Sequence, residues 1–121
     1  MAKILIIDDE KDVCEGFSGV LHEERHEADT ALNAWEGLEK LKTNTYNLIF
    51  LDVLMPRMEG REALEKIKEV CDTPVVIMSG YLPPHKEKEI LKAGAFASLK
   101  KPLDLKQVFT LIEKAAKLKK G

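Results

Sequence analysis

Short apolar segments of strand length alternate along this chain with amphipathic segments of helical length. Three of the apolar segments are nearly continuous, namely KILIID (3–8), NLIFLD (47–52) and PVVIMS (74–79). Uninterrupted runs rich in Ile and Val are typical of parallel strands that are covered on both faces. EADTA (27–31) and AFASLK (95–100) are less apolar and suit the outer positions of a sheet.

The segments between these strands place apolar residues three and four positions apart, as on one face of a helix. The four stripes are Val13, Phe17, Val20 and Leu21; Ala34, Leu38 and Leu41; Ala63, Leu64 and Ile67; and Leu105, Val108, Phe109 and Ile112. A further helix is predicted to begin at Pro84, which suits a first helical turn, and to stop near Gly94. Five strand–helix units in strict alternation predict one doubly wound α/β domain over residues 1–121, with a five-stranded parallel sheet between five helices.

Composition excludes several classes of function. Of the 121 residues, 45% are hydrophobic and 33% are charged, as in an ordinary globular domain. The net charge of −2 provides no overall field for nucleic acid, and no apolar run is long enough for a signal peptide or a membrane span. Two widely separated cysteines indicate free thiols rather than a disulfide framework. We therefore expect a cytoplasmic protein without direct nucleic-acid binding or membrane insertion.

Polar residues stand where the predicted strands end. The first strand ends in Asp8 and Asp9, the third in Asp52, the fourth in Ser79 and Gly80, and the fifth in Lys101. Singly, each has an ordinary interpretation: Asp9 can cap a helix, Ser79 can form a turn, and Lys101 can mark an exposed strand exit. The carboxyl ends of parallel strands meet at one edge of the sheet, however, and ligand sites lie there. Together these residues predict a functional site.

The residue types at this edge are suited to phosphoryl transfer. Clustered carboxylates repel one another unless a cation intervenes, and Mg²⁺ prefers such oxygen ligands. Carboxylates can form covalent phosphoryl intermediates, so an ionised Asp52 is a candidate nucleophile toward phosphorus. The reaction then needs positioning and charge stabilisation on the phosphoryl oxygens. We expect Mg²⁺, the Lys101 ammonium, and the Ser79 hydroxyl with the Gly80 amide to hold one oxygen each.

Four motifs in this order resemble the response-regulator receiver domain of two-component signalling, including its chemotaxis members. They are DDE after ILII, LDVLMPRMEG, VVIMSG, and KKP after GAFASL, and the resemblance covers essentially the whole chain. It implies a flavodoxin-like sheet with strand order 2-1-3-4-5. It also implies that Asp52 is phosphorylated and that Asp9 binds Mg²⁺ directly, Asp8 mainly through water, and Leu54 through its carbonyl. The family further implies a cis peptide at Lys101–Pro102.

The same resemblance implies a signalling protein that assists its own phosphorylation and dephosphorylation, and not a turnover enzyme. The phosphoryl donor would be the phosphohistidine of a sensor histidine kinase or of a histidine phosphotransfer protein. Lys101 would pair with the phosphoryl group, and Ser79 would occupy the switch position that grips it. A downstream effector would then bind the face formed by the helix from Pro84, the strand 95–100 and the last helix.

One position departs from the family pattern. The second switch residue is usually aromatic and lies three positions before the lysine, where this chain has Ser98. Phe96 and Tyr81 are nearby aromatic residues, and the segment GYLPPHK places two adjacent prolines before the following helix. Proline stiffens the backbone, so we expect a switch that is weaker or routed differently.

Two other functions can be weighed against the phospho-acceptor. Aspartyl-phosphate phosphatases of the haloacid dehalogenase type place a second Asp two residues after the nucleophile, and here that residue is Leu54. The absence of this general acid argues against a phosphatase. A phosphorylation-independent interaction module on the same fold is the alternative function, although such a module has no need of the complete acidic set with Lys101.

Overall fold

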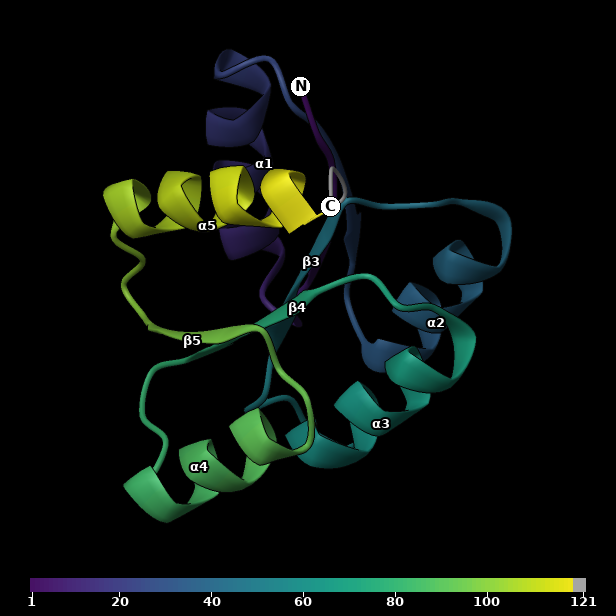
Figure 1. Cartoon of the computed structure of the whole chain (residues 1–121), viewed down its shortest axis with the longest axis vertical. Helices are drawn as coiled ribbons and strands as arrows, with labels where there is room; N and C mark the ends of the chain where they lie inside the picture. The colour runs from purple at the N-terminus through teal and green to yellow at the C-terminus, as the bar shows by residue number, and fades with distance from the viewer. Residues whose placement is uncertain (119–121) are drawn as a thin grey trace.

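The computed structural model of the protein describes residues 1–118, so residues 119–121 of the expected domain lie outside the described residues. Strands and helices alternate strictly along this part of the chain, as predicted (Figure 1). In order they are β1 (Lys3–Ile7), α1 (Lys11–Glu23), β2 (Glu27–Ala31), α2 (Ala34–Thr43), β3 (Leu48–Asp52), α3 (Gly60–Val70), β4 (Val75–Ser79), α4 (Pro84–Lys92), β5 (Ala97–Lys100) and α5 (Leu105–Leu118).

The strands form one parallel sheet in the order β2-β1-β3-β4-β5, which confirms the predicted topology. The two less apolar strands, β2 and β5, occupy the edges as expected. The three central strands are buried almost throughout, because helices cover them from both sides. The direction of winding reverses between β1 and β3. In parallel sheets, ligands bind beyond the carboxyl ends of the two strands where this reversal occurs.

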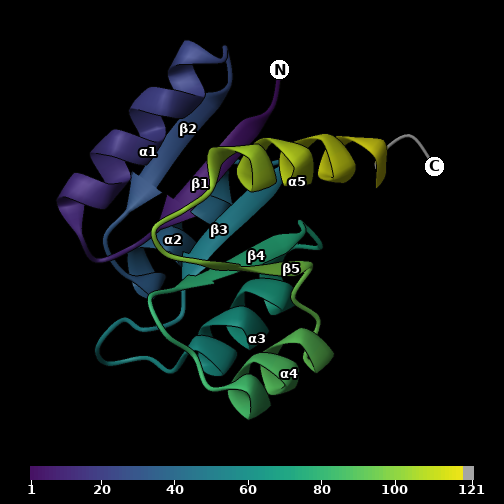
Figure 2. The same ribbon diagram turned by 90° about the vertical axis from the view of Figure 1, so that its left-hand side faces the viewer.

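Two helical layers enclose the sheet. Helices α1 and α5 cover one face, and α2, α3 and α4 cover the other (Figure 2). Successive residues of a strand point to opposite faces, so β1 contributes Ile4 and Ile6 to the core under α1 and α5. Its Leu5 and Ile7 pack in the core under α2 and α3. This alternation explains why the central strands are apolar at every position.

Element boundaries differ slightly from those predicted. Three strands begin or end one residue inside the predicted range, and the last strand starts at Ala97. Pro74 lies outside β4 because it has no N–H to donate, although its carbonyl accepts a hydrogen bond from Ile49. Pro84 occupies the first turn of α4, as expected. The capping interpretation of Asp9 is wrong, because Glu10 holds the N-cap position of α1 and makes no side-chain cap bond.

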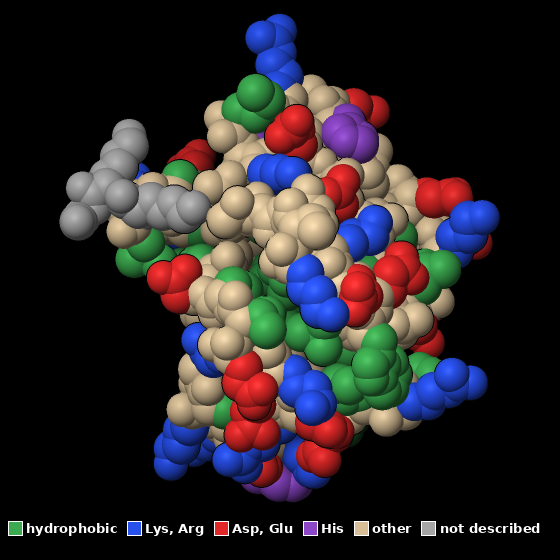
Figure 3. Space-filling model, turned by 90° about the vertical axis from the view of Figure 1, so that its right-hand side faces the viewer, with side chains coloured by type: hydrophobic (Ala, Val, Ile, Leu, Met, Phe, Trp, Pro, Cys, Tyr) green, Lys and Arg blue, Asp and Glu red, His purple; other side chains and the backbone are tan. Residues whose placement is uncertain are grey.

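The surface carries both signs of charge. On the face formed by α2 and α3, Lys and Arg side chains alternate with Asp and Glu around an apolar patch (Figure 3). The patch includes the half-exposed Trp35 and Val70, which line the same shallow groove. This face therefore presents no extended field of one sign, which agrees with the near-neutral net charge.

Candidate functional site

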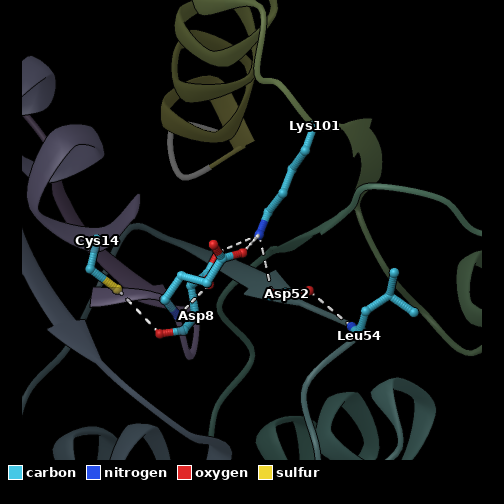
Figure 4. Close-up of polar contacts among 6 residues, drawn as sticks. Asp8, Cys14, Asp52, Leu54 and Lys101 are labelled. Carbon is cyan, nitrogen blue, oxygen red and sulfur yellow. Dashed lines mark hydrogen bonds and ion pairs between the residues drawn. The ribbon is translucent and has the colours of Figure 1, made fainter. Parts of the chain in front are cut away.

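The sheet brings the predicted residues together at its carboxyl edge. Asp8 follows β1 directly, while Asp52 and Ser79 are the last residues of β3 and β4. All three are buried, with 0%, 5% and 5% of their surfaces exposed. Lys101 follows β5, and its side chain runs inward over the ends of β1 and β3 (Figure 4). The fold thus collects groups that lie up to 93 positions apart in the sequence.

The Lys101 ammonium lies at the centre of the site, among three carboxylates. Its Nζ atom lies 2.6 Å from Asp8 Oδ2 and 3.2 Å from Asp52 Oδ2, and it reaches Glu10 Oε1 at 3.9 Å. Burial acts to lower the pKa of Lys101, but the hydrogen bond to Asp8 and the charge of Asp52 outweigh burial, and the pKa is raised. The lysine therefore remains charged and neutralises part of the acidic cluster.

Asp52 is held in a defined orientation. Its Oδ1 accepts a hydrogen bond of 2.9 Å from the Leu54 backbone N–H, and its Oδ2 faces Lys101. Burial raises the pKa of Asp52, and the charge of Asp8 adds to the rise, while the Leu54 N–H and Lys101 oppose it. A buried carboxylate in this position is ionised only with help from neighbouring cations and donors.

Asp8 is anchored from the α1 side of the site. Its Oδ1 accepts a hydrogen bond of 2.9 Å from the Glu10 N–H, and its backbone carbonyl accepts a hydrogen bond of 3.3 Å from the Cys14 thiol. Burial and then the charge of Asp8 raise the pKa of Cys14 to about 11. Cys14 is therefore a neutral thiol that packs beneath the site.

The acidic set fits a hard divalent cation. Oxygen atoms of Asp8, Asp9 and Asp52 all lie within 4.8 Å of one another. Asp9 is exposed, whereas the other two carboxylates are buried, so the cluster opens toward solvent on one side. Carboxylate oxygens with room for water are the ligands that Mg²⁺ prefers. The chemistry of these three donors is compatible with the Mg²⁺ ion that the sequence resemblance implied.

Ser79, Gly80 and Leu54 also lie at this edge. The Ser79 carbonyl accepts a hydrogen bond of 2.8 Å from the Lys101 N–H, and Gly80 follows at the exposed surface. Leu54 is 53% exposed beside Asp52, and the Lys101–Pro102 peptide is cis, as the resemblance implied. Ser98 lies on β5, where its hydroxyl donates a hydrogen bond of 2.8 Å to Glu87 Oε2 of α4.

Comparisons with known proteins identify the family of this chain. The sequence model of the family described as "Response regulator receiver domain" matches residues 4–113. The chain belongs to this family. Its strand order and helices are accordingly those of the receiver domains of two-component systems, a group of signalling proteins.

Two named relatives of this receiver domain are longer proteins. It is 31% identical over 112 residues to the "Response regulator ArlR" of Staphylococcus saprophyticus, covering 93% of this chain and 51% of that protein. It is 33% identical over 113 residues to the "Transcriptional regulatory protein CpxR homolog" of Haemophilus influenzae, covering 93% and 49%. The chain thus spans about half the length of the curated relatives it matches.

Solved structures resemble the receiver domain over nearly its full length. A response regulator receiver domain protein from Clostridium thermocellum superposes with a TM-score of 0.92 at 30% identity, covering 99% of this chain and 98% of that one. A two-component response regulator from Clostridium difficile gives a TM-score of 0.91 at 32% identity, with 97% of both chains covered. These likenesses confirm the flavodoxin-like fold class.

Sequence reasoning missed three contacts of the site. Glu10 approaches Lys101, Cys14 binds the carbonyl of Asp8, and Leu54 contributes its N–H to Asp52. Glu10 could have been found because it adjoins the acidic pair. The other two contacts carry no sequence signal, because an ordinary Cys and any residue with a backbone N–H could provide them.

Proposed function

We propose that this receiver domain accepts a phosphoryl group on Asp52 and changes conformation in response. The observation that carries the proposal is the Lys101 ammonium, which lies 2.6 Å and 3.2 Å from two buried carboxylates at the carboxyl edge of the sheet. A purely structural module gains little from a buried acidic cluster, since unpaired charges are costly away from water. The arrangement is useful where a charged group must be bound and released.

Asp52 is the proposed nucleophile. One of its carboxylate oxygens forms a bond to phosphorus while the bond from phosphorus to the nitrogen of a donor phosphohistidine breaks, and the histidine leaves with the electron pair. The Leu54 N–H holds the carboxylate in place, and the Lys101 ammonium stabilises charge on a phosphoryl oxygen. The Ser79 hydroxyl and the Gly80 N–H, at the end of β4, would bind a further oxygen.

Asp8, Asp9 and Asp52 would hold Mg²⁺, together with the backbone carbonyl of Leu54. The mutual approach of the three carboxylates supports this assignment. The bound ion would offset negative charge as the phosphoryl group approaches the acidic cluster. Asp8 and Asp52 would then share their oxygens between the ion and Lys101.

We assign the donor to a sensor histidine kinase or a histidine phosphotransfer protein. A groove of about 610 Å³ lies between α1 and the segment after β5, beside the acidic cluster. Val13, Phe17 and Val20 line it from α1, and Lys101 lines it from the opposite side. A partner seated in this groove would have its phosphohistidine next to the site lysine. Apolar side chains flanked by charged groups are suited to a transient protein contact.

We place the downstream effector on the face of α4, β5 and α5. A hollow of about 420 Å³ there is lined by Ser98 of β5 and by residues of α5, including Thr110 and Lys114. Polar and apolar side chains both line this hollow, as expected for a surface where a contact forms and breaks. We further propose that residues 1–121 make up a single receiver domain.

Intact mass after incubation with acetyl phosphate and Mg²⁺ tests the proposal. We expect the gain of one phosphoryl group, and we expect its loss in Asp52→Asn and in the presence of EDTA. Lys101→Met is expected to slow the reaction strongly while leaving the acceptor carboxylate in place. A folded protein that gains no mass under these conditions would contradict the proposal and favour the phosphorylation-independent interaction module.

A further inference from the structure

Helix α4 has a small apolar anchor. Within Pro84–Lys92, all of which the structure describes, Ile90 is the one buried residue, and Leu91 is 37% exposed. Helices α1, α2 and α5 bury three residues each and α3 buries four. Because apolar burial is the main force that holds a surface helix in place, α4 depends on its polar contacts more than the other helices do.

Those polar contacts reach in two directions. Toward α3, Glu89 Oε1 of α4 accepts a hydrogen bond of 2.7 Å from Arg61 Nη1, and Lys86 lies 3.6 Å from Glu59. The side chains of both pairs are about half exposed, and ion pairs open to solvent contribute little to stability. Toward β5, Glu87 Oε2 accepts a hydrogen bond of 2.8 Å from the Ser98 hydroxyl. That contact is partly buried and has a charged acceptor, so it is the stronger kind of polar contact.

The contact between Glu87 and Ser98 joins two segments that are both connected to the phospho-acceptor site. One segment runs from Ser79 through residues 80–83 into the first turn of α4, where Glu87 lies. The other is β5, which carries Ser98 three positions before Lys101. At the site these segments are already linked, since the Ser79 carbonyl accepts the Lys101 N–H at 2.8 Å. The bond between the Ser98 hydroxyl and the Glu87 carboxylate is a second link between the same two segments, farther from the site.

We propose that the Ser98–Glu87 hydrogen bond is a latch that holds α4 against β5, and that phosphorylation of Asp52 releases it. The proposal rests on the proposed function of Asp52. A phosphoryl group held between Ser79 and Lys101 draws Ser79 toward Asp52. Pro83 and Pro84 make the connection into α4 stiff, so a displacement of Ser79 passes to Glu87 instead of being absorbed in a loose loop.

Release of the latch is a shift in an existing equilibrium. Helix α4 is held or released, and the phosphoryl group favours the released arrangement by its differential contacts. Coupling of this kind is reciprocal. A substitution that removes the hydroxyl–carboxylate contact takes away what holds α4, so it should release α4 without phosphorylation. Phosphorylation should then produce a smaller further change.

Amide hydrogen exchange of a peptide spanning residues 80–93 measures this release directly. We expect Ser98→Ala to raise the opening equilibrium of α4 in the unphosphorylated protein by about tenfold, as for the loss of one hydrogen bond to a charged group. Glu87→Ala should do the same, and the double variant should add little to either single change. Glu87→Gln, whose amide oxygen can still accept from Ser98, should retain most of the protection.

Glu89→Ala is the matched control, because it makes the same substitution as Glu87→Ala on the same helix but removes the contact with α3. It should leave the exchange of residues 80–93 near that of the unmodified protein. Phosphorylated protein, with its modification verified by intact mass, should exchange like unphosphorylated Ser98→Ala. Normal protection in unphosphorylated Ser98→Ala would overturn the latch, and so would protection that survives phosphorylation.

The two proposals fail in distinguishable ways. If Asp52 gains no phosphoryl group, the proposed function fails, while the exchange of unphosphorylated Ser98→Ala still reports whether the contact restrains α4. If Asp52 is modified and α4 keeps its protection, the proposed function stands and the latch is refuted.

Discussion

Replacement of Lys101 by Met offers the sharpest test of the electrostatics at the carboxyl edge. Met keeps most of the aliphatic stem and removes the ammonium. The Lys101 side chain is 17% exposed, and the side chains of Asp8 and Asp52 are 0% and 6% exposed, so little water is available to replace the lost cation. The variant therefore leaves two neighbouring buried carboxylates without their counter-ion.

The size of the loss follows from the distances. At an effective dielectric constant of about 20, the pair at 2.6 Å is attracted by about 6 kcal/mol and the pair at 3.2 Å by about 5 kcal/mol. Desolvation and the repulsion between the two carboxylates offset much of this attraction. Removing one partner of a buried ion pair typically costs about 3–5 kcal/mol. We expect Lys101→Met to lower the free energy of unfolding by about 3 kcal/mol in EDTA.

Urea denaturation with and without Mg²⁺ measures this effect. In Lys101→Met the ion meets no competing ammonium at Asp8, so Mg²⁺ should bind more tightly than in the unmodified protein. A ligand at 100 times its Kd stabilises the folded state by about 2.7 kcal/mol, which would restore most of the loss. The stabilisation by Mg²⁺ should thus be larger in the variant than in the unmodified protein.

Asp52→Asn/Lys101→Met is the control for this reasoning. The double variant leaves Asp8 as the one buried carboxylate of the original pair, and it should be more stable in EDTA than Lys101→Met. A loss below about 1 kcal/mol in Lys101→Met would show that the ammonium contributes no more than an exposed ion pair. Equal stability of the single and double variants would refute the repulsion between Asp8 and Asp52.

Three further predictions concern other parts of the chain. Gly94 has a φ of +115°, so Gly94→Ala should cost about 1–3 kcal/mol, whereas Gly19→Ala, with open space in a helix interior, should gain about 0.5–1 kcal/mol in urea denaturation. Burial and then the N-terminal charge lower the pKa of His26, whose Nδ1 accepts the Ala2 N–H at 3.0 Å. The folded state therefore resists protonation of His26, and the free energy of unfolding should fall as pH decreases below the ordinary pKa of a histidine, about 6.5. His26→Gln should lack this decline. Cys14 is buried and its pKa is raised to about 11, so iodoacetamide should alkylate it far more slowly than Cys71 at neutral pH. Equal rates of alkylation, followed by mass spectrometry, would contradict this.

The fold was predictable because its signals are periodic and repeated. Runs such as residues 47–52 are apolar at every position, and that pattern has one simple explanation in a sheet covered on both faces. Strict alternation with helices then dictates parallel strands, whose carboxyl ends share an edge. The gathering of Asp8, Asp52 and Ser79 follows from topology alone. The strand order itself came from the family resemblance and not from these patterns.

The contacts within the site were less predictable because they depend on side-chain rotamers and backbone orientation. Lys101 lies closer to Asp8 than to Asp52, and a flexible four-carbon stem could favour either. The Leu54 N–H that orients Asp52 belongs to a loop with no periodic signal. Ser98 was recognised as a departure from the family pattern, but its bond to Glu87 requires α4 and β5 to be in place first.

Strand β5 is well suited to carry a signal because of its position at the sheet edge. Leu99 is its one buried residue among Ala97–Lys100, all within the described part of the chain, whereas every residue of β3 and β4 is buried. An edge strand that pairs on one side can shift with fewer broken contacts than a central strand, and low-stability segments are where conformational change concentrates. Lys101 at its end touches the acidic cluster, and Ser98 touches α4. A polar latch on this strand can therefore report a change at Asp52 while the apolar core on both faces of the sheet stays packed.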